Sequence, residues 1–189
     1  VKYPEVKALL DKEEYPKNPD ELETIEVAKA VEYLKRLKRN KLSIKLINRL
    51  HYLCFNKTKH FAGKLRNVEV VIRDGYGNII HQGAHSKEVL NLLNELVKWY
   101  NKHLGKYPPL LMAALLHNQF EEIHPFQDGN GRVGRLLLNF ALVKNNYPPI
   151  NIMLKDRQRY YKTLRIFDKK GDIKPTLRFL ISQYKKQYG

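Results

Sequence analysis

The segment from Leu110 to Phe120 is almost wholly apolar, and it begins directly after the pair Pro108-Pro109. Proline is favoured in the first turn of a helix, because the N–H that it lacks has no intrahelical partner there. A helix that is apolar on all sides must be surrounded by other elements. The chain therefore has to fold around this helix, and the dipeptide His124-Pro125 predicts where the helix ends.

Most of the remaining chain also has helical periodicity, with apolar residues at intervals of three and four. Ser43 is expected to be the N-cap of one helix, and Ser86 to open another. A further apolar helix is expected directly after Arg135. The other helices are expected near residues 22–39, 157–167 and 173–186. The predicted fold class is therefore mostly α.

One region departs from the helical pattern. Residues 68–72 alternate and are rich in β-branched side chains, residues 74–78 have turn composition, and residues 79–81 resume the strand pattern. A lone hairpin is marginal as structure, but its exposed edge is suited to holding an extended peptide by strand addition. An ordinary connecting hairpin is the alternative interpretation.

Length and composition set the class of protein. With 189 residues, 43% of them hydrophobic, the chain is expected to form one globular domain. It contains no apolar run of about eighteen residues and no secretory segment, so we expect no membrane span and a cytoplasmic location. Because the chain begins at Val1, we expect a trimmed fragment. The single cysteine, Cys54, lies among apolar residues and is expected in the core.

The net charge of +16 raises the alternative of a nucleic-acid-binding module. The basic residues are scattered, however, and the modest clusters at residues 35–39 and 185–186 end amphipathic helices, where cations complement the helix dipole. No helix-turn-helix spacing, zinc finger or aromatic RNA-binding signature accompanies them. We therefore do not expect nucleic acid to be the main partner.

The run from His124 to Arg135 combines an imidazole, a carboxylate, three glycines and two guanidinium groups. Residues 129–134 spell G-x-G-x-x-G, but an apolar helix precedes them instead of a strand, so a Rossmann site is excluded. Glycines still allow a phosphate to approach the backbone, and the N–H groups that open the next helix point toward an anion. Arg132 and Arg135, three residues apart, are expected to reach the same ligand. The run indicates a polyphosphate site.

Two further side chains of this run have chemical alternatives. Asp128 is suited to hold Mg²⁺ beside a polyphosphate, and it is equally suited to be a helix N-cap. His124, presented where a helix must end, is a candidate general base for a hydroxyl nucleophile. His81 and His85 do not form a helical zinc pair, because Gly83 and the hairpin intervene, and His117 is expected to be a core histidine.

The run from His124 to Arg135 matches the signature H-P-F-x-[D/E]-G-N-G-R-x-x-R of the Fic family without a departure. Residues 62–66 and 70–72 resemble the segment G-x-[FY]-R and the flap of that family. The resemblance is strongest to the subfamily of animal endoplasmic-reticulum Fic enzymes and covers roughly residues 20–184. Its C-terminal part rests on Tyr147-Pro148-Pro149, Arg157, Tyr160-Tyr161, Gly171-Asp172, Pro175 and Arg178-Phe179.

The resemblance implies a single Fic domain over residues 1–189, folded as a helical bundle with a small β-hairpin flap at about 68–81. It implies a protein adenylyltransferase, an enzyme that transfers AMP from ATP to a Ser, Thr or Tyr hydroxyl of a target protein, or of itself, and releases pyrophosphate. His124 would be the catalytic base, and Asp128 would bind Mg²⁺ between the α- and β-phosphates. Phe126 would pack into the core and fix the loop.

The resemblance also assigns binding residues. Gly129, Asn130 and Gly131 would form the anion hole, Arg132 would bind the β/γ region, and Arg135 the γ-phosphate. The adenine pocket would be lined by Tyr160 and Tyr161, whereas Asp168 stands where several relatives have an asparagine that contacts adenine. The flap residues that would bind the target by main-chain pairing are Val70, Val71 and Ile72.

Several related activities are alternatives within the same family. They are transfer of another nucleotide, phosphotransfer and removal of AMP from a modified protein. Phosphotransfer is associated with a lysine at the second glycine of the motif, and Gly131 therefore favours AMP transfer.

The partners implied are a hydroxyl-bearing target protein, a second copy of the chain in a homodimer, and an inhibitory element. In many relatives an inhibitory helix with the pattern [S/T]-x-x-x-E-[G/N] pairs its glutamate with the second motif arginine. That pattern is absent from residues 1–40 and from the C-terminal end, and in relatives it lies just upstream of a segment resembling residues 5–10. We therefore expect that the helix was removed or is supplied by a partner, so that Arg135 is the control point.

Overall fold

The computed structural model describes residues 16–73 and 75–189, and two long helices form its centre. They are α5 (Pro109–Ile123) and α6 (Asn130–Lys144), which make the most extensive contact between any two elements. Most side chains of α5 are buried, as expected for a helix that is apolar on nearly all sides. The prediction of a buried central helix is confirmed.

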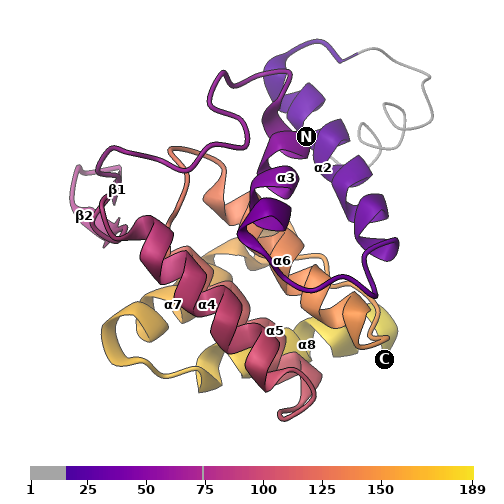
Figure 1. The fold of residues 1–189 in the computed structure, drawn as a ribbon. Helices are drawn as coiled ribbons and strands as arrows, with labels where there is room; N and C mark the ends of the chain where they lie inside the picture. The colour runs from indigo at the N-terminus through magenta and orange to yellow at the C-terminus, as the bar shows by residue number, and fades with distance from the viewer. Residues whose placement is uncertain (1–15, 74) are drawn as a thin grey trace.

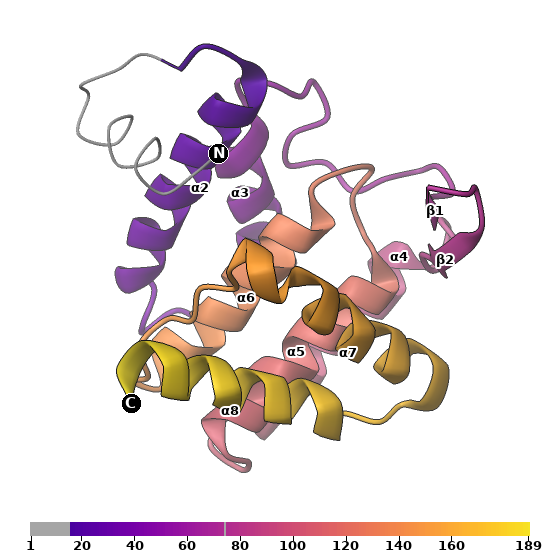
Figure 2. The ribbon, with the colours of Figure 1, turned by 180° about the vertical axis from the view of Figure 1, so that it is seen from behind.

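The other helices cover this central pair from several sides (Figure 1 and, from behind, Figure 2). α2 (Pro19–Lys35) and α3 (Ile44–Phe55) pack against α6. α4 (Val89–His103) contacts α5 on the face seen in Figure 1, and α7 (Arg157–Lys170) and α8 (Lys174–Tyr188) contact α5 on the face seen in Figure 2. A 3₁₀ turn at Leu154–Asp156 leads into α7. The mostly helical fold class is therefore confirmed.

Local hydrogen bonds explain where these helices begin. The side chain of Ser43 accepts a hydrogen bond from the backbone N–H of Leu46 at 3.1 Å, which confirms it as the N-cap of α3. α2 begins earlier than expected, because Asn18 caps it and Pro19 occupies its first turn. α4 begins at Val89 and not at Ser86, which lies in the turn ahead of the helix and donates its backbone N–H to the Glu69 side chain, from the segment before β1.

The expected hairpin is present but short. β1 (Val71–Arg73) pairs antiparallel with β2 (Ile79–Gln82), with Ile72 opposite His81. Residues 68–70 precede the strand, and Asp74 of the predicted turn lies outside the described residues. The sheet in the described part of the chain has two strands, so each strand has an outer edge without a strand partner.

Buried apolar side chains form one continuous cluster, to which all the long helices contribute. Cys54 belongs to it, as expected, and burial raises the pKa of its thiol to about 12.

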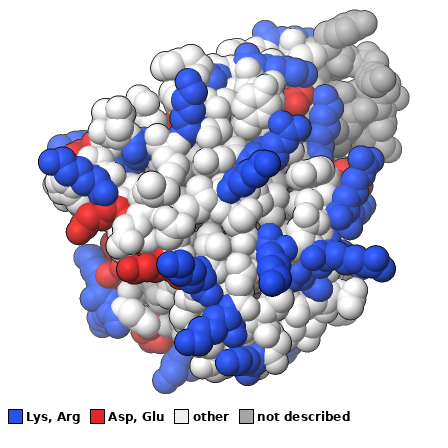
Figure 3. All heavy atoms as spheres, viewed as in Figure 1, with Lys and Arg blue, Asp and Glu red and all other residues white. Residues whose placement is uncertain are grey.

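Lys and Arg side chains are spread over the face seen in Figure 3 and do not gather in a single stripe. Within residues 16–73 and 75–189, the search for a helix long and apolar enough to cross a membrane finds none.

The core also holds a neutral histidine. His117 on α5 is fully buried, and its Nε2 lies 2.8 Å from the hydroxyl oxygen of Tyr160 on α7. Burial lowers the pKa of His117 to about 4. The expectation of a core histidine is confirmed, with a hydrogen bond that ties α5 to α7.

We expect the free energy of unfolding to fall as the pH drops from 6.5 to 4. The folded pKa of His117 lies below its unfolded value of 6.5, so the unfolded chain takes up the proton first and protonation favours unfolding. This one group accounts for up to about 3 kcal/mol across that window. Urea unfolding at several pH values measures it.

The matched variants are His117→Gln and His60→Gln, since His60 is exposed. The first should make the pH dependence shallower between 6.5 and 4, and the second should leave it unchanged. An equal dependence in both variants would contradict the assignment.

Candidate active site

His124 lies at the end of α5 in a left-handed backbone conformation, with φ 53° and ψ 59°. Its Nδ1 lies 3.2 Å from the carbonyl oxygen of Glu121, which can only accept, so Nδ1 carries the proton and Nε2 is the free base. Burial lowers the pKa of His124 to about 4. The imidazole is therefore neutral at pH 7 and able to take a proton.

Arg66 holds the backbone around His124 in place. Its buried guanidinium donates to the carbonyl oxygens of His124 and Val68, each at 2.7 Å, and also to that of Ala84. The end of α5 is thereby tied to both ends of the hairpin. Sequence analysis placed Arg66 in a family segment but gave it no structural role.

Asn130 closes the loop that follows His124. Its side chain accepts from the backbone N–H of Phe126 at 2.8 Å and donates to the carbonyl oxygen of Phe126 at 2.7 Å. The Phe126 ring is fully buried, as expected, and stacks on His51 with 3.9 Å between ring centroids. Asn130 therefore shapes the loop with its side chain, while its backbone opens α6.

Asp128 does not cap α6. The N-cap is Gly129, whose φ of 81° and contact with the Phe55 ring leave no room for a side chain. Asp128 instead accepts from the N–H of Gly129 at 2.6 Å and from Lys59 at 3.1 Å. Partial burial acts to raise the pKa of Asp128, but these partners outweigh it and the pKa lies below its ordinary value. The N-cap alternative is therefore wrong.

The two motif arginines have different neighbours. Arg132 donates to Glu23 of α2 and stacks over the Phe55 ring, 4.7 Å from its centroid. Arg135 lies beside Gly131, and its charge opposes the burial that raises the pKa of Glu121 to about 7. In this structure the two guanidinium groups thus do not converge, because Arg132 is held by a buried carboxylate.

A cavity of about 300 Å³ adjoins His124 between the hairpin, α5 and α7. Ile72 and Ile80 of the hairpin line one wall, and Tyr161 and Asp168 of α7 line another. Tyr160 does not line it, because its side chain is buried in the core against His117. Of the predicted flap residues, Ile72 reaches this cavity, whereas Val70 and Val71 are outside its lining.

His81 is a cavity residue whose position the sequence did not reveal. Its Nδ1 lies 3.3 Å from the Asp168 carboxylate, and its ring centroid lies 5.2 Å from that of His124. Its Nε2 is buried and has no hydrogen-bond partner among the described residues. His85 lies beside Glu69, with 3.7 Å between its Nδ1 and Glu69 Oε1. The local sequence carries no signal for the contact between His81 and α7.

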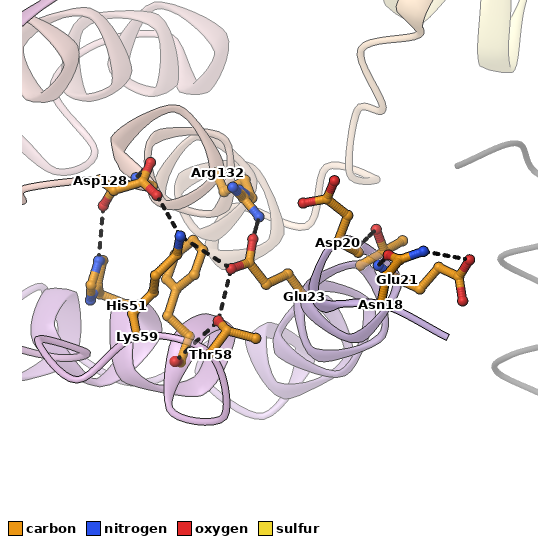
Figure 4. A network of polar contacts seen from close by, with 12 residues as sticks. Asn18, Asp20, Glu21, Glu23, His51, Thr58, Lys59, Asp128 and Arg132 are labelled. Atoms are coloured by element: carbon orange, nitrogen blue, oxygen red, sulfur yellow. Dashed lines mark hydrogen bonds and ion pairs between the residues drawn. The ribbon is translucent and has the colours of Figure 1, made fainter. Parts of the chain in front are cut away.

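The sequence also did not predict a polar network that lies beside the motif. It joins the loop after α3 to α2 and to the motif, and Figure 4 shows its members. Glu23, Thr58, Lys59 and His51 contribute to it, and His51 donates from Nε2 to the carbonyl oxygen of Asp128 at 3.1 Å. These residues come from segments far apart in the sequence, so no local pattern links them.

The described residues contain no group of three or more His, Cys, Asp or Glu side chains that could enclose a metal ion. A single half-exposed carboxylate, Asp128, lies at the start of α6. Mg²⁺ commonly keeps several waters and binds one or two carboxylates together with substrate phosphates. The donor set therefore fits a Mg²⁺ ion that arrives with a nucleotide, and does not fit an ion held by the protein alone.

Comparison with known proteins agrees with this arrangement. The model of the Fic/DOC family matches residues 41–142. A curated relative, the protein adenylyltransferase Fic of Drosophila erecta, is 37% identical over 108 residues, which cover 54% of this chain and 22% of the relative. The chain thus spans about a fifth of that relative's length.

Solved structures are similar over nearly the whole chain. A Fic domain containing signaling protein from Bacteroides thetaiotaomicron has a TM-score of 0.87 and 27% identity, covering 98% of this chain and 77% of the other. The BepC protein of Bartonella tribocorum, solved with bound AMPPNP, has a TM-score of 0.62 and 17% identity, covering 89% of this chain and 88% of the other. The second likeness concerns the fold alone.

We expect Gly129→Ala to destabilise the protein by about 3 kcal/mol, because the added Cβ meets both an unfavourable φ and the Phe55 ring. Gly105→Ala is the matched control. Gly105 has a φ of 79° but open space around it, so only about 1 kcal/mol should be lost. Thermal unfolding of both variants measures the difference, and equal losses would show that contact with Phe55 is unimportant.

Proposed function

Because the chain belongs to the Fic/DOC family, we propose that it is a protein adenylyltransferase that transfers AMP from ATP to a target hydroxyl. The acceptor is a Ser, Thr or Tyr side chain of a protein, and pyrophosphate leaves. The observation that carries the proposal is the free Nε2 of His124, which adjoins a cavity and precedes a glycine-rich helix start. The names of the curated relatives support the same activity.

ATP would bind with its base in the cavity and its phosphates at the start of α6. Tyr161 provides an aromatic wall for the base, and Tyr160 supports that wall from beneath. The backbone N–H groups of Asn130 and Gly131 open α6 and form the proposed anion hole together with that of Gly129, which must first leave the Asp128 carboxylate. Arg132 and Arg135 would contact the β- and γ-phosphates, for which Arg132 must leave Glu23. The structure of BepC with AMPPNP supports nucleotide binding by this fold.

His124 would act as the general base. Its Nε2 takes the proton of the target hydroxyl as that oxygen bonds to the α-phosphorus, and the bond from the α-phosphorus to the bridging oxygen of pyrophosphate breaks. The hydrogen bond from Nδ1 to Glu121 fixes the tautomer, and Arg66 fixes the backbone. Positioning of this kind provides much of the catalysis in phosphate transfer reactions.

Asp128 would hold Mg²⁺ in the complex with ATP. The bound ion would neutralise charge on the phosphates. The low pKa of Asp128 keeps its carboxylate ionised and available at neutral pH.

The outer edge of the hairpin, with Val70, Val71 and Ile72, would pair with the main chain of the target segment. An inhibitory element of a partner, where present, would compete for Arg135.

We expect His124→Ala to reduce AMP transfer by at least about a hundredfold, because the hydroxyl proton then has no acceptor. Mass spectrometry of the chain and of lysate proteins after incubation with ATP and Mg²⁺ measures the product. ATP binding, followed by calorimetry, should persist, since the phosphate-binding residues are intact. His60→Ala is the matched control and should label normally; labelling at the normal rate by His124→Ala would overturn the base assignment.

A further inference from the structure

Lys59 lies between two carboxylates of the polar network (Figure 4). Its ammonium nitrogen is 3.1 Å from Asp128 Oδ2 and 3.8 Å from Glu23 Oε1. It belongs to the segment after α3, and its side chain is about one third exposed. The closer partner, Asp128, is the proposed ligand of Mg²⁺.

Of the two carboxylates, Glu23 is the more deeply buried. Its side chain is only 3% exposed, and it accepts hydrogen bonds from Arg132 and, at 2.7 Å, from the hydroxyl of Thr58. A buried carboxylate that loses a cationic partner is strongly destabilising, so Glu23 must stay paired. In this structure the charges of Glu23 and Asp128 are balanced by those of Lys59 and Arg132.

We propose that Lys59 competes with the divalent cation for Asp128 and transfers to Glu23 when the cation binds. The inference rests on the proposed function only in taking Asp128 as the metal ligand. A lysine ammonium and a divalent ion repel each other strongly at contact distance, so they do not share one carboxylate oxygen. Glu23 is within reach as the second position, because a lysine has a flexible four-carbon stem and Glu23 Oε1 already lies 3.8 Å away.

The transfer has a consequence for Arg132. Once Lys59 is close to Glu23, that carboxylate carries two cations and a hydroxyl donor, and each cation is held less tightly. The guanidinium of Arg132 is then free to turn toward the phosphates at the start of α6. Cation binding at Asp128 and phosphate binding by Arg132 are thereby coupled, and each must favour the other by the same factor.

Binding of Mn²⁺ at a fixed concentration of ADP tests the competition without measuring activity, because the donor set at Asp128 fits an ion that arrives with a nucleotide. Mn²⁺ is the probe because the free ion is counted directly by electron paramagnetic resonance. We expect Lys59→Met to bind Mn²⁺ about fivefold more tightly than the unchanged chain, since removal of a half-exposed ion pair is worth about 1 kcal/mol. Thermal unfolding without metal verifies that the variant is folded.

Three controls assign the effect to this site. Lys64→Met removes an exposed lysine of the same segment and should leave the affinity unchanged, which excludes a general loss of charge. Lys59→Arg keeps the charge and should bind as weakly as the unchanged chain. Asp128→Asn, combined with Lys59→Met, should abolish the gained affinity.

A double-mutant cycle tests whether Lys59 moves to Glu23 when the cation binds. Glu23→Gln removes the carboxylate that receives Lys59, so it should weaken Mn²⁺ binding more in the presence of Lys59 than in the Lys59→Met background. Equal weakening in both backgrounds would show that Glu23 acts only through its own charge and would overturn the transfer.

The competition is overturned if Lys59→Met binds Mn²⁺ no better than Lys64→Met, or if neither binds it. AMP transfer by the unchanged chain is measured separately. If the unchanged chain transfers AMP but Lys59→Met does not change the Mn²⁺ affinity, only the proposed role of Lys59 is wrong. If Lys59→Met binds Mn²⁺ more tightly but the unchanged chain does not transfer AMP, only the proposed activity is wrong.

Discussion

The packing of α5 against α6 is the contact on which the candidate site depends. The loop from His124 to Gly129 is the connection between these two helices, so their packing sets where the base and the helix start lie. Gly134 allows the close approach, since a side chain there would collide with Glu121. Asn130 and the buried Phe126 then hold the loop in one conformation.

Buried polar groups connect this centre to the outer elements. Arg66 ties the end of α5 to the hairpin, His117 ties α5 to Tyr160 of α7, and Glu23 ties α2 to Arg132. An unpaired polar group inside a protein is costly, so each contact constrains the element that supplies it. The same contacts surround the cavity and the start of α6, where the proposed nucleotide would lie.

Much of the fold could be predicted from the sequence because its signals are local. The apolar run after Pro109, the cap at Ser43 and the alternation before the turn at Gly77 each depend on residues within one element. The predicted helix boundaries were wrong where a residue distant in the sequence makes a contact. An example is Glu69, which accepts a hydrogen bond from the backbone N–H of Ser86 ahead of α4. Asp128 was ambiguous for the same reason, since the space at Gly129 is set by Phe55 of α3.

The sequence by itself determined the helical class, the family resemblance and the set of residues in the motif, because these depend on residue type and spacing along the chain. Only the tertiary structure decided their partners. It placed His81 beside His124, turned Arg132 toward Glu23 and set Lys59 between two carboxylates. Such contacts join segments far apart in the sequence, and they follow from how the helices pack rather than from any local pattern.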